Sequence, residues 1–202
     1  MQKVAVTGGT GGLGSAVVER LSRDYDVVVL DRTRLDDITN EASVTKAFSA
    51  FGEHYALVHL VGGWTGGKVA ETSLETWERM LALNLTGAFL AIRESLKHLT
   101  RPGRIVAISS IASVSPFTPG SAAYTVTKSA LNTLMETIAA EYRGTGITAN
   151  ALLPDAMATP AMLRETKDPS TLVPLEHVAE TIAFLLSEAA ANTTGALIPL
   201  RK

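Results

Sequence analysis

The chain has 202 residues, of which 46% are hydrophobic and 19% charged, which suits one well-buried domain over residues 1–202 and excludes a disordered chain. A formal net charge of −2 and the lack of a basic block predict neither nucleic acid nor an anionic membrane as a partner. Because there is no cysteine, disulfides, thiolate nucleophiles, iron–sulfur clusters and cysteine-ligated zinc are excluded.

Strand-like and helical segments alternate along the whole chain. Lys3–Thr7 is an apolar strand that leaves no room for a charged leader, and no apolar run approaches the ~20 residues that span a bilayer, so we expect a cytoplasmic protein. Further strands are expected at 26–30, 56–61, 104–109, 147–152 and 196–200, and helices at 12–23, 40–51, 73–99, 121–142 and 174–187. Strands that are apolar on both faces predict a doubly wound parallel α/β sheet.

The connection after the second strand is unusually short. Only a few residues separate Asp31 from the helix that begins near Asn40. A crossover between parallel strands needs about a dozen residues, commonly a helix. We therefore expect residues 32–37 to cross as a loop and to supply at most a stub of strand.

A glycine-rich turn follows the first strand. Gly8, Gly12 and Gly14 have the spacing Gly-x-x-x-Gly-x-Gly, directly before a helix. Such a turn lets the backbone approach a pyrophosphate, and the helix N-terminus offers unpaired N–H groups and partial positive charge. The motif predicts a dinucleotide cradle, whereas the plainer interpretation is a glycine turn without a ligand.

Asp31 ends the second strand and bears on the choice of dinucleotide. A carboxylate there can accept hydrogen bonds from both hydroxyls of an adenosine ribose, and it repels a 2′-phosphate. Asp31 therefore favours NAD(H), or else it is only a solvated strand end. Arg32 argues the other way, because a guanidinium is the usual partner of a phosphate, so NADP(H) stays open.

Tyr124 and Lys128 are four residues apart in an expected helix and share one face. A phenol is a poor acid–base catalyst at neutral pH, but a nearby ammonium stabilises the phenolate and lowers the phenol pKa. The pair predicts a proton donor with a tuning cation. The alternative is a surface aromatic ring stacked on a lysine stem.

Several other polar residues are candidates for the same site or for structural roles. Ser109 and Ser110 end the strand before that helix, where a hydroxyl could bind a carbonyl oxygen or only cap the strand. Asn84 lies in an apolar helix, as a structural hydrogen-bonding hub or part of a water relay. The histidines show no metal-binding spacing, so no metal site is expected, and we take His59 as a neutral, hydrogen-bonded core residue.

The cradle, Asn84 within Asn-Leu-Thr-Gly-Ala-Phe, the serine pair and Tyr124-Thr-Val-Thr-Lys128 occur in an order that resembles the short-chain dehydrogenase/reductase family. The resemblance covers nearly the whole chain. It implies a Rossmann-type sheet of about seven strands. It also implies that Tyr124 is the proton donor or acceptor, Lys128 tunes it and holds the nicotinamide ribose, Ser110 orients the carbonyl and Asn84 holds a relay water.

The same resemblance assigns the cofactor site. Asp37 and Ile38 look like the family's contact to adenine, and Gly62 and Gly63 look like the loop beside the adenosine ribose. The full expected cofactor-binding set is Thr7, Gly8, Thr10, Gly12, Leu13, Gly14, Asp31, Arg32, Asp37, Ile38, Val61, Gly62, Gly63, Tyr124, Lys128, Pro154, Ala156 and Met157.

Several loops look like those of dihydropteridine reductases, which use NADH to reduce a quinonoid dihydropterin. They are Val61-Gly-Gly-Trp-Thr-Gly-Gly67, Thr118-Pro-Gly120, Leu153-Pro-Asp-Ala-Met-Ala-Thr-Pro160 and Pro174-Leu-Glu. Those enzymes lack the catalytic serine that this chain offers at Ser110, with Ser109 and Ser113 as other candidates. The family's Pro-Gly after the sixth strand reads Pro154-Asp155 here.

Three functions compete. The leading one is an NAD(P)(H)-dependent oxidoreductase that moves a hydride between nicotinamide and a small carbonyl, alcohol or related unsaturated substrate, with NAD(H) favoured. Pterin reduction is the second, and a non-catalytic dinucleotide-binding sensor or scaffold is the third. The helices at 73–99 and 121–142 are apolar beyond one covered face and pair across a two-fold axis in the family, so we expect a homodimer or homotetramer.

Overall fold

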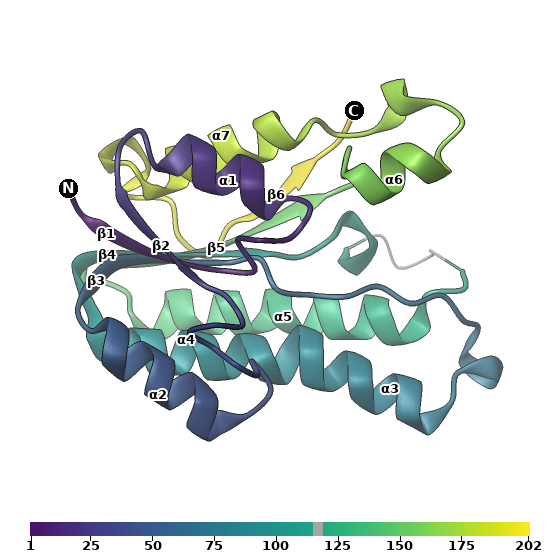
Figure 1. Ribbon diagram of the computed structural model, residues 1–202, viewed down its shortest axis with the longest axis horizontal. Coiled ribbons are helices and arrows are strands. Elements are labelled where there is room, and N and C mark those ends of the chain that lie inside the picture. Colours follow the sequence, from purple (N-terminus) through teal and green to yellow (C-terminus); the bar gives the residue numbers. More distant parts are fainter. Residues whose placement is uncertain (115–118) are drawn as a thin grey trace.

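A computed structural model describes residues 1–114 and 119–202 and shows one parallel β-sheet between two layers of helices (Figure 1). Within the described residues the sheet has six strands in the order β2-β1-β3-β4-β5-β6. Their bounds are β1 (Lys3–Thr7), β2 (Asp26–Leu30), β3 (His54–His59), β4 (Leu99–Ile108), β5 (Ile147–Pro154) and β6 (Leu197–Leu200). The doubly wound parallel sheet expected from the sequence is confirmed.

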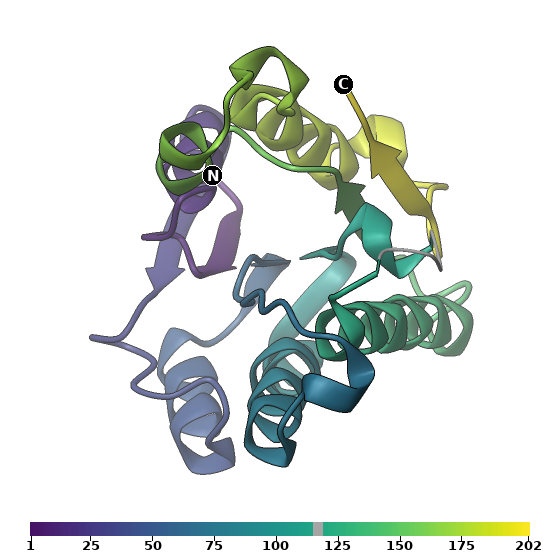
Figure 2. The same ribbon diagram turned by 90° about the vertical axis from the view of Figure 1, so that its right-hand side faces the viewer.

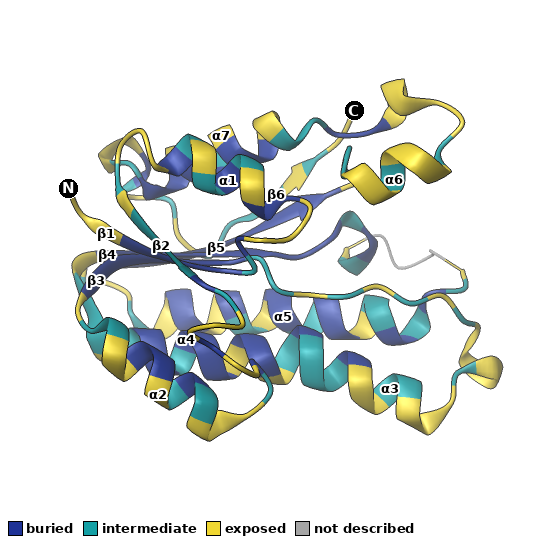
Figure 3. Cartoon of the chain, in the orientation of Figure 1, coloured by how far each residue is buried: buried dark blue, intermediate teal, exposed yellow. Residues whose placement is uncertain are grey.

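The helices cover both faces of this sheet, so its inner strands are the most buried part of the molecule (Figure 3). One face is covered by α1 (Gly14–Leu21) and α7 (Leu175–Leu186). The other is covered by α2 (Glu41–Phe51), α4 (Gly87–His98) and α5 (Ala122–Glu141), with α3 (Leu74–Leu81) leading into α4. The continuous apolar runs of the strands follow from this burial on both sides.

The order of the strands places a crevice at the end of β1. The chain leaves β1 through α1 to reach β2 on one side, and then returns through α2 to β3 on the other side of β1. Connections that diverge in this way leave the carboxyl ends of β1 and β3 open between them, which is where open α/β sheets bind ligands. Figure 2 views the sheet from the end that carries these connections.

The expectation of about seven strands needs correction, because the third strand of a seven-stranded sheet is missing. Residues 31–40 form turns and contain no strand, as the short connection predicts, and α2 begins directly after them. Asn40 caps that helix, since its side chain accepts a hydrogen bond of 2.9 Å from the Ser43 N–H. One edge of the sheet is therefore β2, and the other is β6 (Figure 2).

The helix expected over 73–99 is interrupted. A π-helical segment, Ala82–Thr86, separates α3 from α4, and β4 starts at Leu99, five residues before the strand start expected at 104. A short helix, α6 (Pro160–Glu165), follows β5 and was not expected. Thr118, part of the pterin-like Thr-Pro-Gly motif, lies outside the described residues.

Candidate active site

The glycine-rich turn after β1 is packed so closely that side chains cannot replace its glycines. Gly8 has φ +74°, and a Cβ on it would lie 3.0 Å from the Val61 nitrogen. A Cβ on Gly14 would lie only 2.4 Å from the Gly8 carbonyl oxygen. Glycine at these positions lets the turn fold against the start of α1. The close approach between helix and turn is what a pyrophosphate cradle requires.

The start of α1 is open for an anion. No side chain caps its N-terminus, where Leu13 is the N-cap residue. The Gly14 N–H donates to the Gly11 carbonyl at 3.0 Å, and the other N–H groups of the first turn are left for a ligand or water. A Cβ on Gly12 would lie 3.1 Å from the Thr159 side chain, so the segment that follows β5 lies against the cradle. Pro154, Ala156 and Met157 belong to this stretch of chain.

A cavity of about 260 Å³ lies beside the cradle, between β2 and the loop that follows β3. Seven residues of the expected cofactor set line it: Gly8, Thr10, Asp31, Arg32, Asp37, Ile38 and Val61. Leu30, Leu35, Asp36, Thr39 and Leu83 line it as well and were not expected. The shortened connection thus folds into one wall of the cavity, and the residues found there fit an adenosine.

The charge of this cavity is mainly negative. Asp31, Asp36 and Asp37 face a single cation among the lining residues, Arg32. Hydrogen bonds from the Thr33 hydroxyl (2.6 Å) and N–H (3.0 Å) hold the pKa of Asp31 below its ordinary value. Hydrogen bonds from Thr39 do the same for the pKa of Asp37. Asp31 and Asp37 are therefore ionised at neutral pH.

The reacting residues converge at the carboxyl end of β4 and the start of α5. Tyr124 lies on the first turn of α5, and its phenol hydrogen-bonds to the side chain of Ser110, just after β4. Burial raises the pKa of Tyr124, and the bond to Ser110 lowers it. We expected Lys128 to lower the pKa of Tyr124. Lys128 is not among the groups that shift this pKa, and burial has the largest effect on it.

Lys128 is buried beneath the loop that follows β3. Its ammonium donates a hydrogen bond of 2.8 Å to the Ile108 carbonyl, at the end of β4. Burial lowers the pKa of Lys128 to about 8. A Cβ on Gly62 would lie 3.0 Å from Lys128 Nζ and 3.2 Å from Asn84 Oδ1. Gly62 therefore lets the loop lie directly over the cation and the amide.

Asn84 is a hydrogen-bonding hub inside the π-helical segment. Its Oδ1 accepts from the Gly63 N–H (2.8 Å), and its Nδ2 donates to the Gly63 carbonyl (3.0 Å) and to Thr127 Oγ1 (3.1 Å). The amide thus ties the loop after β3 to the helix that carries Tyr124. These bonds agree with the interpretation of Asn84 as a structural hydrogen-bonding hub. A relay water at this side chain stays a prediction.

The serines near Tyr124 have different roles. The Ser109 hydroxyl donates to the Lys128 carbonyl at 3.2 Å, and the Ser113 hydroxyl donates to the Ser110 carbonyl at 2.5 Å. Both hydroxyls are thus bonded to the backbone. Ser110 alone of the three bonds to Tyr124, while its own oxygen accepts from the Ala112 N–H at 3.2 Å. Ser110 is therefore the serine best placed to act with the tyrosine.

His59 ends β3 and is completely buried. Its Nδ1 is 2.9 Å from the Thr7 hydroxyl, so a hydrogen bond joins the last residues of β1 and β3 beneath the cradle. Burial, with a smaller effect of the Lys128 charge, lowers the pKa of His59 to about 3. The expected neutral, hydrogen-bonded core histidine is confirmed.

Among residues 1–114 and 119–202, none of the helices has the length and the apolar character that a membrane span needs. No cluster of three or more histidine and carboxylate side chains there could hold a metal ion.

A parallel sheet with a glycine cradle and a tyrosine–lysine pair at its carboxyl edge defines a Rossmann-like oxidoreductase. A family model described as "Enoyl-(Acyl carrier protein) reductase" matches residues 3–200. The chain belongs to the short-chain dehydrogenase/reductase family. The matched length confirms the family expected from the motifs.

Individual relatives agree with this assignment. Glucose 1-dehydrogenase 2 of Bacillus subtilis is 27% identical, over 96% of this chain and 90% of the relative. A protein of Xanthobacter autotrophicus named "Inactive 2-(S)-hydroxypropyl-CoM dehydrogenase 2" is 35% identical, over 79% of this chain and 78% of its own length.

Solved structures show the same fold. A short-chain dehydrogenase/reductase from Serratia marcescens has a TM-score of 0.86 at 25% identity, over 98% of this chain and 96% of that one. A short-chain dehydrogenase of Burkholderia cenocepacia, solved in complex with NADP, has a TM-score of 0.85 at 21% identity, over 99% and 96% of the two chains.

Proposed function

We propose that this oxidoreductase is NAD(H)-dependent and moves a hydride between nicotinamide and a small carbonyl or alcohol substrate. The observation that carries the proposal is the convergence of Ser110, Tyr124 and Lys128 at the same edge of the sheet as the glycine cradle. A bound nicotinamide supplies the hydride. The chain's own residues must then supply the proton, orient the carbonyl and hold the cofactor.

Tyr124 is the proton donor in the reducing direction. As a hydride reaches the carbonyl carbon, the carbonyl oxygen takes the phenolic proton, and solvent later returns a proton to the tyrosine. A pKa raised by burial keeps the phenol protonated at neutral pH, which suits this direction. The Ser110 hydroxyl orients the same oxygen and donates to it as negative charge develops.

Lys128 and Asn84 organise the site around the reacting groups. With a pKa of about 8, Lys128 is mostly protonated at neutral pH, so it offers a buried cation to a cofactor ribose. Asn84 fixes the loop at Gly63 beside that cation. The fixed loop keeps the site in one arrangement before the substrate arrives.

The charge of the adenosine cavity supports NAD(H) over NADP(H). Three carboxylates face one guanidinium there, so a 2′-phosphate would enter a negative field. Hydrogen bonds from Thr39 have the largest effect on the pKa of Asp37, and the charge of Arg32 lowers it further, so this guanidinium already has an acidic neighbour. We expect the family's NADP-binding members to differ at this point.

Comparing Tyr124→Phe with the native protein tests the catalytic proposal. Both proteins should bind NADH equally, while reduction of a panel of small ketones, aldehydes and quinones should fall by about 10²- to 10⁴-fold in the variant. Ser109→Ala is the matched control and should keep most of the activity. Full activity of Tyr124→Phe on every accepted substrate would overturn the mechanism.

Reduction of a quinonoid dihydropterin is the second candidate. Trp64 is 69% exposed on the loop that follows β3, where its indole could stack on a planar substrate. Turnover of a quinonoid dihydropterin with NADH tests this candidate directly. If pterin turnover exceeds that of every ketone in the panel and falls in Trp64→Ala, the pterin is the better substrate class.

The non-catalytic alternative has support from the Xanthobacter autotrophicus relative, which is named as an inactive dehydrogenase. The intact set of Ser110, Tyr124 and Lys128 favours turnover in this chain. Cofactor binding without turnover of any compound in the panel would favour a sensor or scaffold instead.

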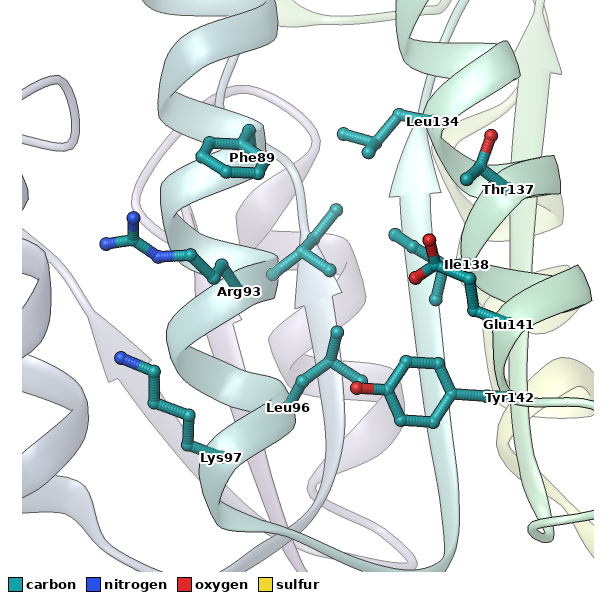
Figure 4. A pocket seen from close by; sticks show the side chains of 10 residues that line it. Phe89, Arg93, Leu96, Lys97, Leu134, Thr137, Ile138, Glu141 and Tyr142 are labelled. Carbon is teal, nitrogen blue, oxygen red and sulfur yellow. The ribbon is translucent and has the colours of Figure 1, made fainter.

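We also propose that the protein acts as a homodimer or homotetramer through the outer faces of α4 and α5. A cavity of about 390 Å³ lies between these helices (Figure 4). Its floor is apolar, with Ile92 and Ile138, and its rim carries the half-exposed ring of Phe89. Light scattering of the native protein should give a mass that is two or four times 21.3 kDa, and Phe89→Glu should lower this mass. A monomeric mass for the native protein would refute the proposal.

A further inference from the structure

Within the part of the chain that the structure describes, the missing third strand leaves the backbone of β2 without a neighbouring strand on its outer side. The Asp26 N–H donates to the Gln2 carbonyl at 2.9 Å, so Asp26 faces β1. Successive residues of a strand alternate in direction, so Val28 and Leu30 also face β1, while Val27 and Val29 direct N–H and C=O groups outward. A contact of Arg34 supports this alternation. Its Nη1 donates a hydrogen bond of 3.2 Å to the Val29 carbonyl, which therefore points away from β1.

The outer side of β2 is otherwise unprotected. In residues 1–114 and 119–202 no group bonds to the outward N–H of Val27 or Val29, or to the Val27 carbonyl. Proteins commonly blunt such an edge with proline, lysine or a bulge within the strand. The five residues of β2 contain neither proline nor lysine, and the pairing of β2 with β1 is regular.

An apolar cavity of about 390 Å³ lies against this edge, between β2 and α2. Val28 and Leu30 of the strand, and Ala47, Ala50 and Phe51 of the helix, form its walls. The charged side chains that line it are both cations, Lys3 and Arg34. A strand laid along β2 would direct every second side chain into this cavity and would meet positive charge there.

We propose that the β2 edge is a docking site for an extended segment of a partner protein, which adds to the sheet as a seventh strand. Its backbone would bond to Val27 and Val29, small apolar side chains would enter the cavity, and acidic residues would face Lys3 and Arg34. Charge favours an acidic segment over a second copy of this chain, because the cavity is lined by Lys3 and Arg34, whereas a second copy would bring mixed charge, its own Asp26 together with the same two cations.

A synthetic peptide tests the proposal. It alternates valine and threonine, carries glutamate at both ends, and is titrated into the full-length protein while amide hydrogen exchange is followed. The N–H groups of Val27 and Val29 should exchange quickly without peptide and become protected with it. A peptide with lysine in place of glutamate should bind more weakly. A peptide with N-methylated alternate amides should not protect these groups. Equal binding of all three peptides would overturn the proposal.

Variants of the protein locate the site. Lys3→Glu should weaken binding of the acidic peptide by about 3- to 10-fold, because a solvent-exposed ion pair between Lys3 and a peptide glutamate is replaced by two like charges. Lys202→Glu is the control, since it makes the same charge change beyond β6 at the opposite edge. Val27→Pro removes an outward N–H without removing a bond to β1, and it should weaken binding at least about tenfold.

Three outcomes would contradict the proposal. Binding that Lys3→Glu and Val27→Pro leave unchanged would place the peptide elsewhere. Failure of the acidic peptide to protect Val27 and Val29 at any concentration would show that the edge takes no strand. Protection of the Val29 N–H in the protein alone, rising with protein concentration and lost in Val27→Pro, would show that a second copy covers the edge instead.

Discussion

Replacing Gly14 with alanine should disrupt the cradle more than any other single methyl group added there. The new Cβ would lie 2.4 Å from the Gly8 carbonyl oxygen and 2.4 Å from the Gly9 carbonyl carbon, where ordinary contacts are 3.4–4 Å. The overlap is with backbone atoms, which cannot rotate away as side chains do. Overpacking of this kind costs about 1–3 kcal/mol or more, and we expect the upper end.

The matched control is Gly12→Ala, whose Cβ would lie 3.1 Å from the Thr159 side chain. That side chain can move, so Gly12→Ala should cost clearly less. In a chain of about 200 residues, a loss of ~3 kcal/mol lowers the melting temperature by roughly 6–12 °C. Thermal unfolding and NADH titration of both variants measure the effect. Equal melting temperatures for Gly14→Ala and Gly12→Ala would refute the close packing described for the cradle.

Three further predictions follow from the site. Ser110→Ala should raise the pKa of Tyr124, because the variant lacks the side-chain hydrogen bond that lowers this pKa. The limb of the rate–pH profile that reports Tyr124 should then move to higher pH. Ser109→Ala should leave that limb in place. The pKa of His59 is about 3 in the folded protein and 6.5 in the unfolded chain, so its contribution to stability is complete above pH 6.5 and is lost on acidification towards pH 3, by roughly 1.4 kcal/mol per pH unit. Urea unfolding of His59→Asn should show a smaller loss of stability on acidification than the native protein. An equal loss in the two proteins would contradict the neutral histidine. Asp31→Ala should shift relative affinity from NADH towards NADPH by roughly tenfold, and an unchanged ratio would show that Asp31 does not read the ribose.

The overall architecture could be predicted because local pattern and burial agree. The β-branched run of β2 and the turn glycines of the cradle each specify one conformation by themselves. The absent third strand was also foreseeable, since too few residues separate Asp31 from α2 to form a crossover. The interruption between α3 and α4 was not, because a π-helical segment depends on tertiary bonds such as those of Asn84 with Gly63.

The candidate site was only partly predictable for the same reason. Motif spacing selects Tyr124 and Lys128, yet it cannot show that burial rather than the lysine dominates the tyrosine pKa. Nor can it separate Ser110 from Ser109 and Ser113, because it does not show which groups their hydroxyls contact. Leu83 follows no cofactor motif, yet it lines the cavity beside the cradle together with Val61.

The measurement that tests the central claim most directly is a parallel titration of the purified protein with NADH and NADPH, followed by nicotinamide fluorescence. The charge of the cavity beside Asp31 predicts clearly tighter binding of NADH. Tighter binding of NADPH would show that Arg32 outweighs the three carboxylates. Binding of neither dinucleotide would contradict the account, because the cavity formed by the shortened connection would then not be an adenosine site.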